Sequence, residues 1–133
     1  MTITLPISRS GRAIEVSPQS ARAHYNLGTA LMERQRTAEA AAHLQKATEI
    51  RPPYSDAHYN LGNALMAQGR LADAVVSYRR ALMLTPADWQ MHNNLGVAML
   101  KTGDVAAAII EFKRTLELNP KCASARVNLA KLL

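Results

Sequence analysis

Histidine recurs at a fixed spacing and is the first residue type to consider for chemistry. His24, His58 and His92 stand 34 residues apart. Imidazole nitrogens bind transition metals and transfer protons near neutral pH. A shared metal site needs ring nitrogens within about 3 to 4 Å of one another, whereas equivalent positions on stacked helices lie about 10 Å apart. We therefore predict that these histidines pack against their neighbours and bind no metal.

An acid and a histidine, Glu39 and His43, lie one helical turn apart in the segment EAAAH. This spacing is common in ordinary helices, so we expect a surface pair. No phosphate-binding loop, nucleophile elbow or zinc-protease motif occurs in the sequence. Because residues repeated in every unit are the reverse of a single active site, we expect no enzymatic activity and no cofactor.

The charge pattern bears on nucleic acids. The 133 residues carry a formal net charge of +6, but the basic residues are scattered and only 5% of the residues are aromatic. That is too few for a base-stacking surface, so we expect no specific nucleic-acid binding.

Compartment can also be inferred from composition. No apolar run approaches the roughly 18 residues that cross a membrane, and the first residues lack the layout of a signal peptide. The single cysteine, Cys122, excludes an internal disulfide. We expect a cytoplasmic protein that does not bind membranes.

The whole chain follows the same period as the histidines. HYNLG begins at His24 and again at His58, and HNNLG begins at His92. Prolines, alanines and one bulky residue per unit keep this spacing: Pro18, Pro52, Pro86 and Pro120; Ala40, Ala74 and Ala108; Leu44, Tyr78 and Phe112. A fixed period of about 20 to 50 residues is typical of a solenoid, in which each unit buries its apolar face against the next.

Each unit has the pattern of a helical hairpin. His24, Leu27, Gly28 and Leu31 share one face of a first helix, and Ala40, Leu44 and Ala47 mark the inner face of a second. We expect the turns to use Gly69 and Gly103 as helix C-caps. We expect Ser20, Ser55 and Asp88 as N-caps. Glycine costs about 1 kcal/mol inside a helix, so Gly28, Gly62 and Gly96 indicate a close approach of the second helix, with the small Ala40, Ala74 and Ala108 facing them.

These repeated residues resemble the tetratricopeptide repeat, whose pattern combines Leu-Gly on the first helix with alanine, a bulky residue and proline on or after the second. The resemblance covers residues 12–133. It implies an all-α solenoid of antiparallel helix hairpins wound as a right-handed superhelix. We expect repeats at 20–53, 54–87 and 88–121. A disordered tail (1–11) and the end of an incomplete leading repeat (12–19) would precede them, and 122–133 would be the first helix of an incomplete repeat or a cap.

The resemblance also implies a concave groove that binds peptides or protein segments, lined by the first helices. Helical geometry places a polar stripe opposite the His24/Leu27/Leu31 face. The residues of this stripe that we predict to bind a peptide are Arg22, Asn26, Thr29, Asn60, Asn63, Asn94, Lys101 and Asn128.

Asparagine occupies one position of this stripe in every unit, at 26, 60, 94 and 128. It is a poor residue in the middle of a helix, so four copies suggest a use. Its amide complements a peptide unit and could hold an extended backbone. A similar asparagine ladder lines the superhelix of the O-linked N-acetylglucosamine transferase, which the chain resembles in this respect alone. Alternatively, each amide bonds to a neighbouring helix and stiffens the stack. Sequence alone favours neither interpretation.

Two functions remain open. The first is a scaffold or adaptor module that binds an extended peptide or protein segment. The second is the substrate-presenting repeat region of a larger enzyme such as a glycosyltransferase. The carboxylate clamp of certain co-chaperones is not predicted, because the first helix lacks basic residues near Tyr25 and an asparagine at Thr29.

The two ends of the array are predicted to be uncapped. Leu129 and Leu133 occupy the side of the last helix that a missing second helix would cover. Apolar ends of solenoids tend to bury themselves, so we expect homo-oligomers formed through a terminus. The half-repeat around Ile14 and Val16 is the alternative contact.

Overall fold

The computed structural model describes residues 20–133. The secondary structure of this part of the chain consists of helices joined by turns, without strands. Its elements run in order as helices of 10 to 14 residues: α1 (Ala21–Glu33), α2 (Thr37–Ile50), α3 (Ser55–Ala67), α4 (Leu71–Leu84), α5 (Trp89–Thr102), α6 (Val105–Leu118) and α7 (Ala123–Leu132). The expectations for residues 1–11 and 12–19 lie outside the described residues. None of the helices within 20–133 is long and apolar enough to cross a membrane.

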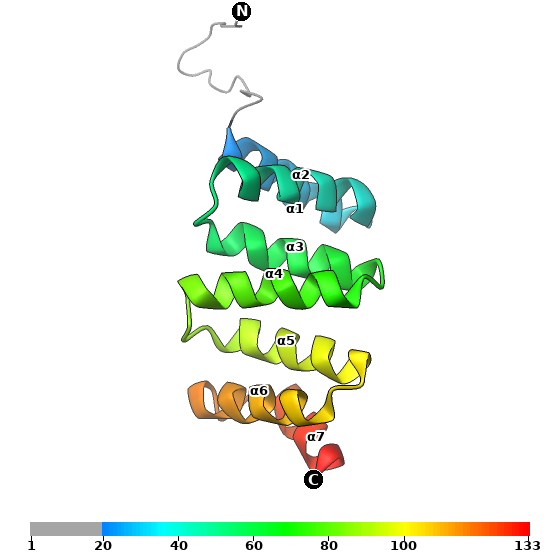
Figure 1. Cartoon of the computed structure of the whole chain (residues 1–133), viewed down its shortest axis with the longest axis vertical. Coiled ribbons are helices and arrows are strands. Elements are labelled where there is room, and N and C mark those ends of the chain that lie inside the picture. Colours follow the sequence, from blue (N-terminus) through cyan, green and yellow to red (C-terminus); the bar gives the residue numbers. More distant parts are fainter. Residues whose placement is uncertain (1–19) are drawn as a thin grey trace, which may run out of the picture.

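The helices form three hairpins that stack along one axis (Figure 1). α1 packs on α2, α3 on α4 and α5 on α6, while each second helix also packs on the first helix of the next hairpin. α7 packs on α6 at the C-terminal end. The prediction of an all-α solenoid of helix hairpins is confirmed.

One continuous core joins the hairpins, because a single cluster of buried side chains includes residues from α1 through α7. The predicted bulky residues Leu44, Tyr78 and Phe112 are almost completely buried, and so are Ala40, Ala74 and Ala108. The bulky residues contact the helix glycines most closely, and only at Gly28 does one of the expected alanines, Ala40, also lie against the glycine, through its carbonyl oxygen. A Cβ on Gly62 would lie 2.6 Å from Cε1 of Tyr78, and one on Gly96 would lie 2.7 Å from Cε1 of Phe112.

Two of the three predicted N-caps are confirmed. Ser20 accepts a hydrogen bond from the Ala23 amide, and Asp88 accepts from the Gln90 and Met91 amides. Ser55 was wrongly expected to be an N-cap, since it is the first residue of α3 and Tyr54 precedes it. The Ser55 hydroxyl instead contacts the carbonyl oxygen of Ala81 on α4, which ties the start of one helix to the end of the next.

Both turn glycines adopt the left-handed conformation that favours glycine. Gly103 caps α5 with φ of 92°, and Gly69 follows α3 with φ of 77°. Gln35 takes the same conformation after α1, with φ of 60°.

Leu27 departs from the predicted face. It was expected with His24 and Leu31 on the buried side of α1, but 45% of its surface is exposed. The equivalent residues Leu61 and Leu95 are buried, with only 4% and 2% of their surface exposed. Leu61 lines the junction with α2 of the preceding hairpin. The burial of Leu61 therefore depends on a neighbouring repeat rather than on its own hairpin.

Candidate functional site

The first helices of the hairpins form one face of the stack, which we call the inner face. Successive first helices, α1, α3 and α5, contact one another more closely than successive second helices do. A stack whose elements approach more closely on one side curves toward that side. The inner face is therefore the concave side, and the predicted polar stripe lies on it.

Asn60 on α3 is bonded to the preceding repeat. Its Nδ2 donates to the hydroxyl of Tyr25 at 3.2 Å and lies 3.5 Å from the hydroxyl of Thr29, both on α1. The Thr29 hydroxyl itself donates to the backbone carbonyl of Tyr25 at 2.9 Å. The side chain of Asn60 is half-buried, so these bonds link two repeats on the inner face.

Asn94 on α5 repeats this arrangement one unit later with shorter bonds. Its Nδ2 donates to the hydroxyl of Tyr59 at 2.9 Å and to Oδ1 of Asn63 at 3.0 Å. Asn63 Oδ1 also accepts from the hydroxyl of Tyr78 at 2.6 Å. This cluster joins α3, α4 and α5, and Asn63 is one of its acceptors rather than a free side chain.

The two outer members of the asparagine series behave differently. Asn26 is exposed, and Asn128 makes no side-chain hydrogen bond among the described residues. For Asn128 the reason lies in the sequence, because Asn93 and Val97 replace the tyrosine and asparagine that Asn94 uses. Asn93 instead donates to the hydroxyl of Ser124 on α7 at 3.1 Å.

Three tyrosines that were not predicted as site residues also belong to the site. Tyr25 and Tyr59 accept the asparagine bonds, and the ring of Tyr54 lies 5.1 Å from that of Tyr25. Arg51 lies over the Tyr54 ring at 4.5 Å. The 34-residue repetition of Tyr25 and Tyr59 one position before the asparagines was the available signal.

Burial keeps the phenols of Tyr54, Tyr59 and Tyr78 protonated. It raises the pKa of Tyr54, of Tyr59 and most strongly of Tyr78, and for Tyr78 the nearby Tyr59 adds to the increase. The Tyr78 hydroxyl therefore remains a hydrogen-bond donor to Asn63 at all physiological pH values.

The asparagine oxygens remain available on the inner face. Asn93 Oδ1 is the one buried side-chain oxygen or nitrogen without a partner in residues 20–133. The Oδ1 atoms of Asn60 and Asn94 accept no hydrogen bond within that range, and they are not buried. Each amide thus donates into the stack through Nδ2 and keeps an unpaired Oδ1 that is not buried.

The other residues predicted to bind a peptide, Arg22 and Lys101, are exposed near opposite ends of the first helices. Arg22 lies in the first turn of α1, and Lys101 lies in the last turn of α5. The structure does not bring them together.

The histidines hold the hairpins together. The ring Nε2 of His58 lies 2.7 Å from the carbonyl oxygen of Pro52, and that of His92 lies 2.8 Å from the carbonyl oxygen of Pro86. His92 Nδ1 also pairs with Glu111 at 2.7 Å. The bonds to Pro52 and Pro86 join α3 and α5 to the proline linkers that precede them.

The predicted Glu39–His43 surface pair is replaced by two other pairs. Glu39 forms an ion pair with Arg36, one turn earlier. His43 Nδ1 lies 3.1 Å from His24 Nδ1 on α1. In the described part of the chain no three histidine, cysteine or acidic side chains converge as metal ligands would.

Sequence comparison places the repeats in a known family. One family model, described as a tetratricopeptide repeat, matches residues 59–121, and another, described as a TPR repeat, matches residues 28–69. A comparison with curated proteins finds no match.

Solved structures share the fold at low sequence identity. MamA aligns with a TM-score of 0.87 and 20% identity over 91% of this chain and 71% of that chain. The first TPR of Spaghetti (RPAP3), solved with an HSP90 peptide, gives 0.82 and 22% over 90% and 94%. The TPR domain of Arabidopsis OM64 gives 0.82 and 16% over 84% and 93%.

The two family models together extend over residues 28–121, where the structure has its stacked hairpins. The chain therefore belongs to the tetratricopeptide repeat family.

Proposed function

We propose that the inner face binds an extended peptide segment of a partner protein, and that the chain acts as an adaptor. The observation that carries this proposal is that the Oδ1 atoms of Asn60 and Asn94 accept no hydrogen bond within residues 20–133 and are not buried. An extended peptide exposes backbone N–H groups along its length, and these need acceptors. Amide oxygens held in place by their own Nδ2 bonds are preorganised acceptors, which lowers the entropic cost of binding.

Residues without a role in stacking complete the proposed site. Asn26 is exposed in the first repeat, and Asn128 is free of side-chain hydrogen bonds within residues 20–133. Arg22 and Lys101 add positive charge near the two ends. A segment that contacts the backbone acceptors and carries acidic residues near its ends would satisfy both features.

The RPAP3 structure supports a peptide ligand for this fold, since it contains the HSP90 peptide SRMEEVD. At 22% identity the likeness extends to the fold alone, so the identity of the ligand must come from experiment.

A phage-displayed library of random 12-residue peptides, selected on the purified chain, tests the proposal. Affinities of the selected peptides are then measured by fluorescence polarisation against Asn26→Ala, Asn60→Ala and Asn94→Ala. We expect each substitution to weaken binding about 5-fold or more, as loss of a hydrogen bond to a ligand does. Lys46→Ala, an exposed position on α2, is the matched control and should leave affinity unchanged.

Asn26→Ala is the decisive variant because Asn26 is exposed, so its loss of affinity would not follow from weakened stacking. Peptides that bind all three variants as tightly as they bind the unmodified chain would refute the proposal.

A further inference from the structure

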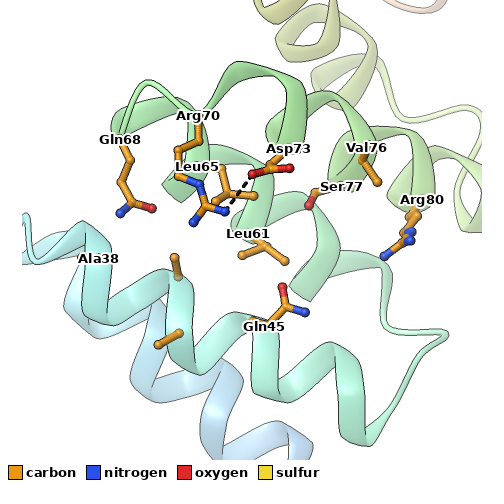
Figure 2. A pocket seen from close by; sticks show the side chains of 12 residues that line it. Ala38, Gln45, Leu61, Leu65, Gln68, Arg70, Asp73, Val76, Ser77 and Arg80 are labelled. Carbon is orange, nitrogen blue, oxygen red and sulfur yellow. Dashed lines mark hydrogen bonds and ion pairs between the residues drawn. The ribbon is translucent and has the colours of Figure 1, made fainter.

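A second surface lies on the side of the stack opposite the inner face. The second helices α2 and α4 stand apart, and α3 forms the floor of the opening between them (Figure 2). The opening holds two adjoining cavities of about 510 and 320 Å³. Gln45 of α2 and Arg80 of α4 line both cavities and reach into the opening from opposite sides. We call this surface the outer groove.

Small side chains on α2 explain why the outer groove is open. Ala41, Ala42 and Thr48 line it from the α2 side. One repeat later, the equivalent positions of α4 are occupied by larger residues: Val75, Val76 and Leu82. The alanines therefore leave space beside Leu61 and Leu65 that larger side chains would fill.

The α4 side of the outer groove combines apolar surface with an unpaired charge. Val76 is 47% exposed and Met83 is 82% exposed. Arg80 lies between them at helical spacing, so all three share one face of α4. Arg70 at the rim is paired with Asp73 at 2.7 Å, whereas no carboxylate in residues 20–133 pairs with Arg80. The face thus presents apolar, cationic and apolar side chains in sequence.

We propose that the outer groove binds a helix of a partner protein that carries an acidic residue between two apolar residues. The apolar residues would stand at positions i and i+7, one against Val76 and one against Met83, and the acidic residue at i+3 or i+4 would pair with Arg80. On the α2 side, Ala41 lines the first cavity and Thr48 lines the second, seven positions or about 10 Å further along the helix. A helix bonds its own backbone groups, which suits a groove lined by side chains.

Charge disfavours a symmetric dimer in which two copies pair through their outer grooves. The exposed apolar pair of α4 itself encloses Arg80, so a copy using this face would place like charges together. Glu49, at the far end of the smaller cavity, already accepts a hydrogen bond from Gln45 at 3.3 Å. Arg80 is therefore the charge that a partner must neutralise.

The proposal is independent of the inner face, because the outer groove shares none of the asparagines or Tyr25 and Tyr59. It is tested with a phage library of 15-residue peptides on a helical framework, selected on the purified chain. We expect enriched peptides to carry apolar residues seven positions apart with Asp or Glu between them. Arg80→Glu and Ala42→Phe should each reduce their affinity 10-fold or more.

Three controls separate this site from other causes of lost binding. Ala106→Phe alters an exposed alanine on α6 and should leave affinity unchanged. Arg79→Ala, at an exposed position of α4 that lines neither cavity, should also leave it unchanged. Replacing the peptide's acidic residue with lysine should abolish binding to the unmodified chain and restore binding to Arg80→Glu. Circular dichroism confirms that each variant remains helical.

Several outcomes would overturn the proposal. One is selected peptides without the apolar–acidic–apolar spacing, and another is peptides whose affinity survives Ala42→Phe and Arg80→Glu. Failure of the charge exchange, or a selection that enriches no peptide relative to the Ala42→Phe variant, counts equally against it.

Discussion

Asn26 and Asn94 occupy equivalent positions but differ in what they contact, and this difference predicts opposite effects of substitution. Asn94 Nδ2 donates two hydrogen bonds to α3, at 2.9 and 3.0 Å. Each such bond contributes about 0.5 to 1.5 kcal/mol, so Asn94→Ala removes about 1 to 3 kcal/mol. Alanine recovers about 0.6 kcal/mol through its helix propensity. The net loss of stability should be about 0.4 to 2.4 kcal/mol.

Asn26→Ala should act in the other direction. Asn26 is exposed, so the substitution removes no buried bond and gains the helix propensity of alanine. We expect the free energy of unfolding to stay unchanged or to rise by about 0.5 kcal/mol. Asn60→Ala should fall between the two, because its bonds are longer, at 3.2 and 3.5 Å.

Urea unfolding followed by circular dichroism measures these differences, with equal slopes as the sign that the variants unfold alike. The order of stability should be Asn26→Ala, then Asn60→Ala, then Asn94→Ala. Equal destabilisation by Asn26→Ala and Asn94→Ala would refute the reasoning, because it would mean that position rather than bonding determines the cost. A neutral Asn94→Ala would show that the cluster around Asn63 contributes nothing to stacking.

Two further predictions concern the tyrosine cluster and the C-terminal end. Burial raises the pKa of Tyr78 above its unfolded value of about 10, so its stabilising contribution is complete below about pH 10 and is lost as the pH rises above it. Tyr78→Phe should reduce this alkaline loss and cost about 1 kcal/mol at pH 7 for the bond to Asn63, and an unchanged pH profile of the melting temperature would contradict it. Leu133 is 77% exposed, whereas Leu129 packs partly against the core, so Leu133→Lys is the cleaner test of self-association. Light scattering should show an oligomer that this substitution dissociates, and a strict monomer at high micromolar concentration would refute the prediction.

The architecture was predictable because it repeats. One hairpin pattern read three times in phase, at Gly28, Gly62 and Gly96, leaves little freedom for another fold. The caps Ser20 and Asp88 were also predictable, since capping depends on residues within one helical turn. The same period points to Tyr54 rather than Ser55 at the start of α3, so this error came from preferring a good capping residue over the register.

Contacts between repeats were harder to infer. The burial of Leu61 and the exposure of Leu27 depend on which helix precedes each one. The partners of Asn94 lie 31 and 35 residues earlier, and only the stacking geometry of two hairpins brings them within reach. The sequence marks such residues by repetition but does not reveal whether they face a ligand or a neighbouring repeat.

The two interpretations of the asparagine series are compatible, because each amide has two ends. The Nδ2 bonds of Asn60 and Asn94 run from each first helix to the one before it, on the side where those helices approach most closely. Bonds on one side of a stack shorten that side and favour curvature toward it. Forming them uses Nδ2 and leaves Oδ1 of the same amide without a partner in residues 20–133. The asparagines that bend the stack therefore orient the acceptors that we propose a peptide uses, and substituting one of them should change curvature and affinity together.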